Sequence, residues 1–417
     1  MFFITRRKER FLLVSLLILH IFLRFYEIET KSIFRYDQVD SAWAVQRIIV
    51  NHSFPLIGPA NKLGSGLFVG PLYYYLISIF YFFTNLDPIA AGLFAGVTSI
   101  IGFFVIFFVF KKIFSLKVAL VGLFINTLTY SSIYFDRIQW EINFVPIVSL
   151  LAFYFLYKIL NGEEKSIVWL AIIVALGFHV HLTTAVFIPI IVLLCLPFFP
   201  KTKKTLIYIL FSIPVLLLGL SPILAANLLS KNSYAANSMN YAHTTFHGFH
   251  LTRILQLKDA ALIQIKFYFP YKILKSLSTF LLPAFFIVYF LNIPSKRKFV
   301  IIALISLWYL VPWIALSGYS GEITDYYFST NLYIGLLILS YLVGKILEIR
   351  NTFLRATITI FCLYYMYLNI NHFLVIKTVG LRNYRAIIMD KVKKGEIVQF
   401  KDGDPFSYVY YVYTRKK

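Results

Sequence analysis

Residues 90–117, AAGLFAGVTSIIGFFVIFFVFKKIFSLK, decide the fold class of this chain. The stretch carries no charge until Lys111 and Lys112, and then a third basic residue follows at Lys117. About 20 consecutive apolar residues are enough for a helix to cross the hydrocarbon core of a bilayer. Since short cytoplasmic loops are rich in Lys and Arg, the stretch predicts a membrane-spanning helix whose basic end lies in the cytoplasm.

The composition of the whole chain supports an integral membrane protein. Its 417 residues are 59% hydrophobic and 14% charged, whereas soluble domains are about half apolar and a quarter charged. Strand-like alternation is missing, so helices rather than a barrel satisfy the backbone in lipid. The net charge of +22 does not indicate a nucleic-acid partner, because the basic residues punctuate the apolar runs as topology signals do.

Working outward from 90–117, we predict about eleven membrane-spanning helices in a multi-pass protein of the cell membrane. The first, at 11–27, follows a basic start that places the N-terminus in the cytoplasm, and we expect it to be retained rather than cleaved. The odd number of spans places the C-terminus outside. The stretch 71–84 is too short to span and is predicted to lie as a helix in the outer interface. The remaining spans are expected at 88–110, 118–134, 142–160, 166–178, 182–199, 205–226, 273–292, 298–316, 326–344 and 353–376.

These spans divide the chain into a transmembrane domain, 1–376, and a small extracytoplasmic tail, 377–417. The transmembrane domain carries two larger external loops, 28–87 and 227–272. The tail is predicted to be α+β, with a helix in RNYRAIIMDKVKKG and strands in EIVQF and SYVYYVY.

The first external loop contains YDQVDSAWAVQRI, residues 36–48, in which Asp37 and Asp40 are three residues apart. If 37–50 is helical, both acids share one face. A carboxylate near an apolar boundary is costly unless it is paired or functional, and it can remove a proton from an acceptor hydroxyl. The alternative is that the acids cap a surface helix, with Arg47 as a partner.

A second acidic site is FDRIQWEINFVP, residues 135–146, between two spans on the outer face. Arg137 lies four residues before Glu141. A guanidinium group suits phosphate through bidentate hydrogen bonds, and a carboxylate can orient a metal or a sugar. An ion pair that seals a tight loop is the alternative.

Two further motifs lie on the same side. FHVHLTTA, residues 178–185, carries His179 and His181, which could bind a divalent metal ion with further ligands or simply form hydrogen bonds. LGSGLFVGPLYYYL, residues 63–76, places Tyr73 and Tyr74 after a glycine-rich stretch. Tyrosine faces can stack on sugar rings, and an interfacial aromatic belt is the alternative.

The order of these motifs resembles the bacterial protein O-mannosyltransferase and aminoarabinose-transferase group. These are polytopic enzymes of the GT-C fold that take a sugar from a polyprenyl-phosphate donor. The resemblance covers about residues 30–200 and more loosely 320–335, where DYYFSTNLY resembles a segment that closes the site and contributes Tyr326 and Tyr327. The family's catalytic Asp is commonly followed by a second acid. Asp37 occupies the first position, whereas Gln38 stands in the second.

The resemblance implies an inverting transfer on the extracytoplasmic face. Asp37 would be the general base, with Asp40 taking over part of the role of the missing second acid. Arg137, or else Lys62, would stabilise the departing polyprenyl phosphate. Some family members use a divalent metal. The remaining residues expected at the substrate are Glu141, Tyr73, Tyr74, His181, Tyr326 and Tyr327.

The partners implied are the bilayer, a polyprenyl-phosphate-linked sugar, and an acceptor that is a protein, lipid or glycan, with no nucleic acid. A polymerase or ligase of lipid-linked glycans is one alternative, although it typically has paired arginines in a long external loop. A transporter is another, but it would carry ionisable groups at mid-membrane and repeated halves, and neither pattern is visible.

Overall fold

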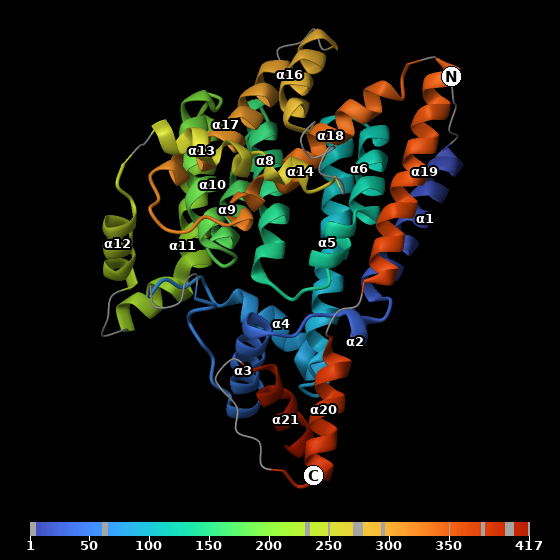
Figure 1. Cartoon of the computed structure of the whole chain (residues 1–417). Helices are drawn as coiled ribbons and strands as arrows, with labels where there is room; N and C mark the ends of the chain where they lie inside the picture. The colour runs from blue at the N-terminus through green and yellow to red at the C-terminus, as the bar shows by residue number, and fades with distance from the viewer. Residues whose placement is uncertain are drawn as a thin grey trace.

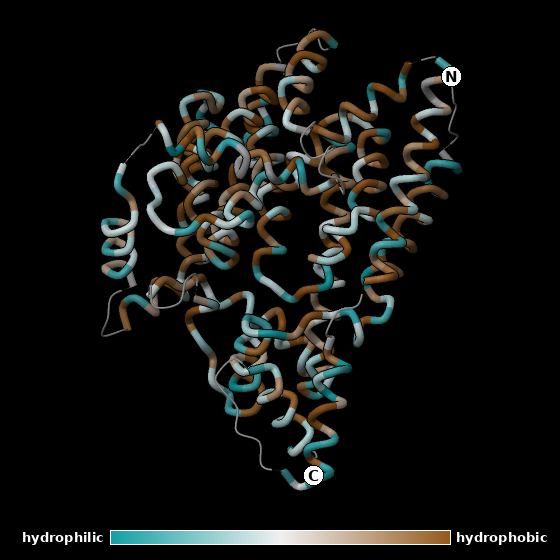
Figure 2. Tube along the Cα trace, in the orientation of Figure 1, coloured by the Kyte–Doolittle hydropathy of each residue, from teal (hydrophilic) through white to brown (hydrophobic). Residues whose placement is uncertain are grey.

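The computed structural model describes residues 6–60, 66–229, 234–248, 251–269, 278–292, 297–349, 351–376, 380–396 and 404–415. In this part of the chain, long helices form a bundle, and a smaller group made of α3, α20 and α21 lies at one end of it (Figure 1). The two termini lie at opposite ends of the molecule. Hydrophilic residues are more frequent around the smaller group than along the bundle helices (Figure 2).

The α-helices are α1 Arg6–Phe25, α2 Ile28–Lys31, α3 Tyr36–Asn51, α4 Leu72–Phe83, α5 Ile89–Ile113, α6 Leu116–Leu128, α7 Tyr130–Phe135, α8 Val145–Leu160, α9 Ser166–Gly177, α10 Leu182–Cys195, α11 Lys203–Leu229, α12 Tyr234–Thr245, α13 Leu251–Ala261, α14 Ile263–Lys266, α16 Leu281–Asn292, α17 Arg297–Ser317, α18 Leu332–Ile346, α19 Thr352–Val375, α20 Leu381–Lys393 and α21 Pro405–Arg415. Short 3-10 turns are η1 Glu141–Phe144, η2 Leu196–Phe198, η3 Ser278–Phe280 and η4 Asp325–Asn331.

In the part of the chain that the structure describes, the stretches predicted to span the membrane are helical, which confirms a helical multi-pass membrane fold. Among the described residues, six helices are long and apolar enough to cross a bilayer. They include α5, α8 with η1, and α18 with η4. The predicted span 118–134 is divided at Thr129 into α6 and α7, and the span expected at 273–292 is described from residue 278 onward.

The helices differ sharply in how far the rest of the protein encloses them. In α18, with η4, 83% of the apolar stretch is buried, whereas the value is 11% in α11 and 17% in α19. A helix that is apolar all round must face either protein or lipid. We therefore place α18 at the centre of the bundle, with α11 and α19 facing lipid.

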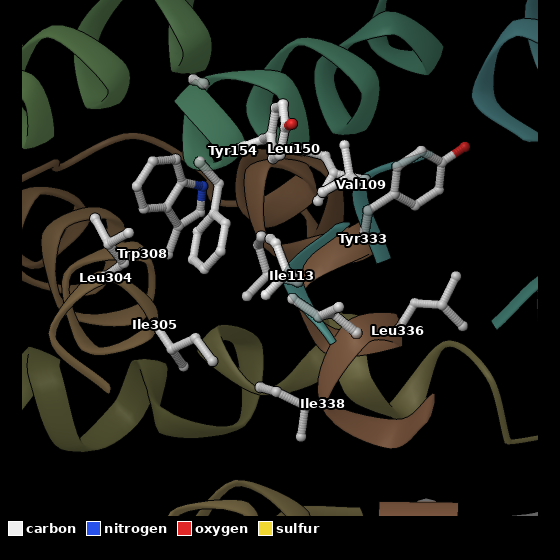
Figure 3. Packing of buried hydrophobic residues seen from close by; sticks show 14 of the residues in the cluster. Val109, Ile113, Leu150, Tyr154, Leu304, Ile305, Trp308, Tyr333, Leu336 and Ile338 are labelled. Atoms are coloured by element: carbon white, nitrogen blue, oxygen red, sulfur yellow. The ribbon is translucent and has the colours of Figure 1, made fainter. Parts of the chain in front are cut away.

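The packing around α18 includes one buried polar contact that orients a large side chain. Trp308 of α17 is fully buried beside α8 (Figure 3). It donates its indole N–H to the Ser149 hydroxyl at 2.7 Å. Ser149 in turn donates to the backbone carbonyl of Thr330 in η4, also at 2.7 Å. The contact satisfies the indole N–H that the apolar core would otherwise leave unpaired, and it attaches η4 to the bundle.

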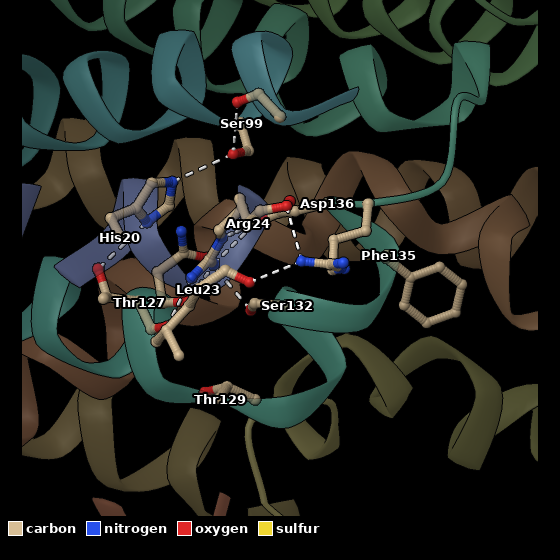
Figure 4. Close-up of polar contacts among 12 residues, drawn as sticks. His20, Leu23, Arg24, Ser99, Thr127, Thr129, Ser132, Phe135 and Asp136 are labelled. Carbon is tan, nitrogen blue, oxygen red and sulfur yellow. Dashed lines mark hydrogen bonds and ion pairs between the residues drawn. The ribbon is translucent and has the colours of Figure 1, made fainter. Parts of the chain in front are cut away.

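A buried polar network holds the C-terminal end of α1 (Figure 4). Arg24 is fully buried, and its Nε and Nη2 donate to Asp136 Oδ2 at 3.0 and 2.7 Å. The same guanidinium donates to the carbonyls of Asn126 and Thr127 at the end of α6. Because one side chain satisfies both a carboxylate and two helix-terminal carbonyls, α1, α6 and the loop after α7 are fastened at one point.

The helix expected at 71–84 is present as α4, but its tyrosines are not arranged as a belt. Tyr73 is buried against protein, which argues against the interfacial belt for this ring, and Tyr81 of the same helix is buried as well. The exposed side of α4 consists of Ile79, Phe82 and Phe83. The aromatic content of the stretch gave no information on which ring faces inward, because that depends on where α3 and α5 pack.

The prediction of a strand at SYVYYVY is wrong, because these residues belong to α21. Tyr408, Val409 and Val412 lie on one face of this helix and are buried. The β-branched and aromatic residues that favour a strand in isolation are here used to pack a helix on α3, so tertiary contacts override local propensity. The second predicted strand, EIVQF, lies almost entirely outside the described residues.

The substitution Arg24→Met should lower the free energy of unfolding by about 3–5 kcal/mol, because it leaves the Asp136 carboxylate and two carbonyls without their donor. The measurement is the midpoint of thermal unfolding in detergent. Lys117→Met is the matched control: Lys117 pairs with Glu348, but both side chains are about half exposed, so the expected change is below about 1 kcal/mol. Equal effects of the two substitutions would contradict the structural role assigned to Arg24.

Candidate active site

Asp37 and Asp40 lie on one side of α3, as the sequence predicts for a helix. Both side chains are exposed, and Asp37 is in the first turn, where the helix dipole favours a negative charge. The pKa of Asp37 is nevertheless raised, first because nearby protein removes part of its hydration and second because Asp40 adds a like charge. A carboxylate that is accessible and less acidic than usual is suited to accepting a proton.

Gln38 fastens the first turn of α3 to the loop after α7. Its side chain is buried, and its Nε2 donates to the backbone carbonyl of Gln139 at 2.8 Å. Its Oε1 accepts from the backbone N–H of Arg35 at 3.1 Å. A carboxylate at this position could not donate a hydrogen bond to the Gln139 carbonyl. The Gln38 amide can, so in this chain the residue after Asp37 fastens α3 to the loop.

Gln139 continues the same attachment, and sequence reasoning missed it. Its side-chain amide donates to the Tyr73 hydroxyl, and its side-chain oxygen accepts from the Tyr81 hydroxyl, each at 3.4 Å. Gln139 is 1% exposed. A polar amide between two apolar residues of the loop was the available signal, because a buried amide needs partners.

Glu141 lies near the acids of α3 and interacts electrostatically with one of them, Asp37. It begins η1, is half-buried, and its carboxylate interacts with the charge of Asp37. Tyr74 of α4 lies beside the same group, and its pKa is raised by burial and by the charges of Glu141 and Asp40. The structure thus brings together four of the residues that the sequence singled out.

The Arg137 side chain is directed toward the end of α1. Its Nη1 donates to the carbonyls of Leu23 and Arg24 at 3.0 and 2.7 Å, and its Nη2 donates to that of Glu27 at 3.2 Å. The side chain is 2% exposed and lies over the Phe373 ring. Burial and the neighbouring charge of Arg24 lower the pKa of Arg137 to about 10, so it is still a cation at neutral pH. Its donors cap the end of α1.

Tyr326 and Tyr327 are brought to the loop that carries Glu141. The Tyr326 ring is 5.4 Å from that of Trp140 and 5.9 Å from that of His181, and it stacks on Tyr327 at 5.0 Å. These rings come from η4, from the loop before η1 and from the start of α10. The segment expected to close the site therefore contacts the loop beside Glu141.

A cavity of about 290 Å³ opens beside this aromatic group. It lies between α7, η1, α14 and η4, and it contains three charged side chains, Asp136, Lys266 and Asp325. Lys62, the other cation considered from the sequence, lies outside the described residues. The remaining lining residues are Asn126, Ser131, Ser132, Phe135, Trp140, Ile142, Asn143, Pro146, Gln264, Phe267, Tyr326, Ser329, Leu332 and Tyr333.

Solved structures of two proteins share this fold. ArnT from Cupriavidus metallidurans, in the apo state, matches 96% of this chain and 84% of its own, with a TM-score of 0.61 and 11% sequence identity. The Archaeoglobus fulgidus oligosaccharyltransferase, in a complex with Zn and sulfate, matches 96% of this chain with a TM-score of 0.59 and 12% identity. The chain spans 56% of the length of that second protein. No family model and no curated protein sequence matches.

The chain has the GT-C fold. This confirms the fold that the order of motifs implied, and at 9–14% identity the likeness to these structures concerns the fold alone. ArnT has also been solved with undecaprenyl phosphate, and that structure matches 99% of this chain with a TM-score of 0.54.

His179 and His181 do not fit a shared metal site in this GT-C chain. His179 Nε2 donates to the Gly219 carbonyl at 2.7 Å, and its Nδ1 faces Gly70, where even a Cβ atom would lie 2.0 Å away. His181 Nδ1 accepts from the Thr183 N–H at the start of α10. Burial lowers the pKa of His181 to about 4, so it is neutral at physiological pH. Within the described ranges, no three His, Cys, Asp or Glu side chains lie close enough to share a metal ion.

Replacing Asp40 by Asn should lower the pKa of Asp37, because removing the like charge favours the ionised form of its neighbour. The measurement is a ¹³C NMR titration of aspartate carboxyl carbons, in which Asp37→Asn identifies the Asp37 signal. Asp390→Asn, which removes an exposed acid paired with Lys394 on α20, is the control and should leave the Asp37 titration unchanged. A pKa that stays the same or rises in Asp40→Asn would show that the two acids do not interact.

Proposed function

We propose that this protein is a membrane glycosyltransferase that moves a sugar from a polyprenyl-phosphate donor to an acceptor hydroxyl. The observation that carries the proposal is Asp37, an accessible acid with a raised pKa that interacts with Glu141 in a GT-C fold. The two neighbours of Glu141 in the chain, Trp140 and Ile142, line a cavity. One ArnT structure holds undecaprenyl phosphate, and one structure of the archaeal oligosaccharyltransferase AglB holds a dolichol-phosphate and an inhibitory peptide. Ligands of this class are consistent with a lipid-linked donor here.

The chemistry we propose is a single displacement with inversion. Asp37 takes the proton of the acceptor hydroxyl, and the oxygen attacks the anomeric carbon on the side opposite the phosphate. The bond between that carbon and the phosphate oxygen breaks, and its electron pair leaves with the polyprenyl phosphate. The raised pKa of Asp37 makes its carboxylate a stronger base toward the acceptor hydroxyl.

The departing phosphate needs a cation, and we assign that role to Lys266 rather than to Arg137. Nη1 and Nη2 of Arg137 bind the carbonyls of Leu23 and Arg24 in α1 and of Glu27 just before α2. A phosphate would have to displace these bonds in a buried place. Lys266 lines the cavity and is partly exposed. An ammonium group placed where charge develops lowers the barrier by electrostatic stabilisation.

The sugar is proposed to lie between Lys266 and Asp37, against Trp140 and Tyr326. Both aromatic side chains line the cavity, and Trp140 directly precedes Glu141 in the chain. Aromatic rings and amides are side chains that can recognise the apolar faces and hydroxyls of a sugar. Asn126, Asn143 and Gln264 supply the amides at this cavity.

We place the active site on the extracytoplasmic side. The basic loops 111–117 and 200–204 mark the cytoplasmic ends of their helices by the positive-inside rule. The acids of α3 and the loop 135–141 are separated from those basic loops by the length of a span. A donor whose polyprenyl chain is in the outer leaflet could present its phosphate at this level.

Asp37→Asn should reduce the rate of transfer by roughly 10²- to 10⁴-fold, because the amide cannot accept the proton. The protein is reconstituted in liposomes with a set of polyprenyl-phosphate sugars, and released polyprenyl phosphate is measured together with the glycosylated acceptor. Asp390→Asn is the control and should transfer at the wild-type rate. If the wild type releases no polyprenyl phosphate with any donor and acceptor, the transferase proposal fails. If Asp37→Asn keeps full activity, the assignment of the base fails.

Lys266→Met should reduce kcat on the order of 10²-fold, because the leaving phosphate loses its counter-charge in the transition state. Lys258→Met, which removes an exposed lysine of the neighbouring α13, should leave kcat unchanged. Arg137→Met should mainly lower the unfolding midpoint, because carbonyls at the end of α1 lose their donor. Full activity in Lys266→Met, or a larger loss of kcat per folded molecule in Arg137→Met, would return the phosphate role to Arg137.

A further inference from the structure

Of the two C-terminal helices, α21 packs against α3, and α20 packs against α21 and α2. Positions along an α-helix advance by about 100° per residue, so Gln46 lies on the side opposite Asp37, and Trp43 lies between Gln46 and Asp40 around the helix. Both of these residues contact α21. The segment from α3 to the start of α5 and the tail share one buried apolar cluster, separate from the main core of the bundle.

The contacts between α3 and α21 are specific in geometry. The Trp43 ring lies 5.1 Å from the rings of both Tyr408 and Tyr411. Gln46 donates its side-chain N–H to the Tyr411 hydroxyl at 3.1 Å. Tyr408 is fully buried and donates its own hydroxyl to the Leu86 carbonyl at 3.2 Å, just before α5. The tyrosine rings of α21 therefore connect α3 to the segment just before α5, where the chain enters the bundle again.

Arg385 of α20 connects the two ends of the first external loop. One of its terminal nitrogens binds Glu29, in α2 just after the first span, and the other binds Asp87, just before α5. The approach of the tail to α2 is close: a Cβ atom at Gly380 would lie 2.1 Å from the Thr30 carbonyl oxygen. A single guanidinium thus bridges the points at which loop 28–87 leaves and enters the bundle, and a planar bidentate group is suited to this task.

We propose that α20 and α21 are a positioning element that holds α3, and with it Asp37, in the place required for proton transfer. The role as a positioning element for catalysis rests on the proposed function. Gln38 and Gln139 fasten the first turn of α3. The tail holds Trp43 and Gln46 farther along the helix and, through Arg385, the two ends of the loop. The helix α3 also packs against α4 in the same apolar cluster, so the tail adds a second restraint to the one that α4 supplies.

The reason this should affect the rate is geometric. A general base works only within hydrogen-bond reach of the proton that it removes, and a displacement of 1 Å can cost about 10²-fold. Loop 28–87 is long, and its catalytic helix is outside the bundle (Figure 1). Contacts from a distant part of the chain can restrict its position without touching the substrate.

The test uses Arg385→Gln in the full-length protein, with Arg382→Gln as the matched control. Arg382 is an exposed arginine on the same helix. A substitution of Asp87 would be less informative, because its carboxylate also accepts from the Ile89 N–H at the start of α5. Three quantities are measured: the kcat per folded molecule, the KM for the donor, and the distance distribution between spin labels at Tyr36→Cys and Glu322→Cys. The labelled protein carries Ala in place of Cys195 and Cys362, and the distances are read by pulsed EPR.

For Arg385→Gln we expect kcat to fall roughly 10- to 100-fold with an unchanged KM, and the distance distribution to broaden. Arg385→Lys should recover part of the rate, and Arg382→Gln should match the wild type in all three quantities. If Arg385→Gln does not fold, Tyr411→Phe, which removes only the hydroxyl that Gln46 contacts, is measured in the same way and should show a smaller change of the same kind.

The proposal is overturned if Arg385→Gln has the same kcat per folded molecule as the wild type, whether or not its distance distribution broadens. It is also overturned if kcat falls in this variant without a broader distance distribution. If the wild type has no transferase activity, the proposed function fails. The distance measurement then still decides whether the tail restrains α3, because it does not depend on turnover.

Discussion

Two buried arginines join the end of α1 to the loop after α7, one donating from the helix to the loop and the other from the loop to the helix. The position of the candidate site depends on this attachment. Arg24 of α1 donates to the carboxylate of Asp136, while the next residue, Arg137, donates back to the carbonyl of Arg24. The side chain from the helix binds the loop, and the side chain from the loop caps the helix. Because both guanidinium groups are buried, loss of either would leave charged or polar groups without partners.

Because the start of the loop after α7 is held at α1, the positions of the loop residues that follow are restricted as well. Gln139 is two residues beyond Arg137 and receives Gln38 of α3. Trp140 meets Tyr326 of η4. Glu141 starts the next span and shares its electrostatic environment with Asp37. A short loop fixed at one end by a buried ion pair and by hydrogen bonds to helix-terminal carbonyls is a rigid support, which the proposed catalytic groups would need. The acids of α3 themselves are exposed, which would leave them accessible to the proposed acceptor.

Local patterns predicted the helices well and the partners poorly. The apolar runs located the spans, and the spacing of Asp37 and Asp40 predicted a shared face, because both depend only on residues close in the chain. Arg137 was expected at the phosphate because of its chemistry, yet its partners are more than 100 residues earlier. The same holds for SYVYYVY, whose residue types favour a strand but whose buried face packs as a helix.

The sequence by itself determined that this is a helical membrane protein with two acids on one face of a helix between its first spans. Hydropathy and helical periodicity are sums over neighbouring residues, so they can be read without knowing the fold. Only the tertiary structure decided which cation caps α1 and which one lines the cavity, and that Gln38 holds α3 to the loop. It also placed the tail behind Trp43. These outcomes depend on which helices pack together, and a buried polar group takes whichever partner the packing brings within hydrogen-bond distance.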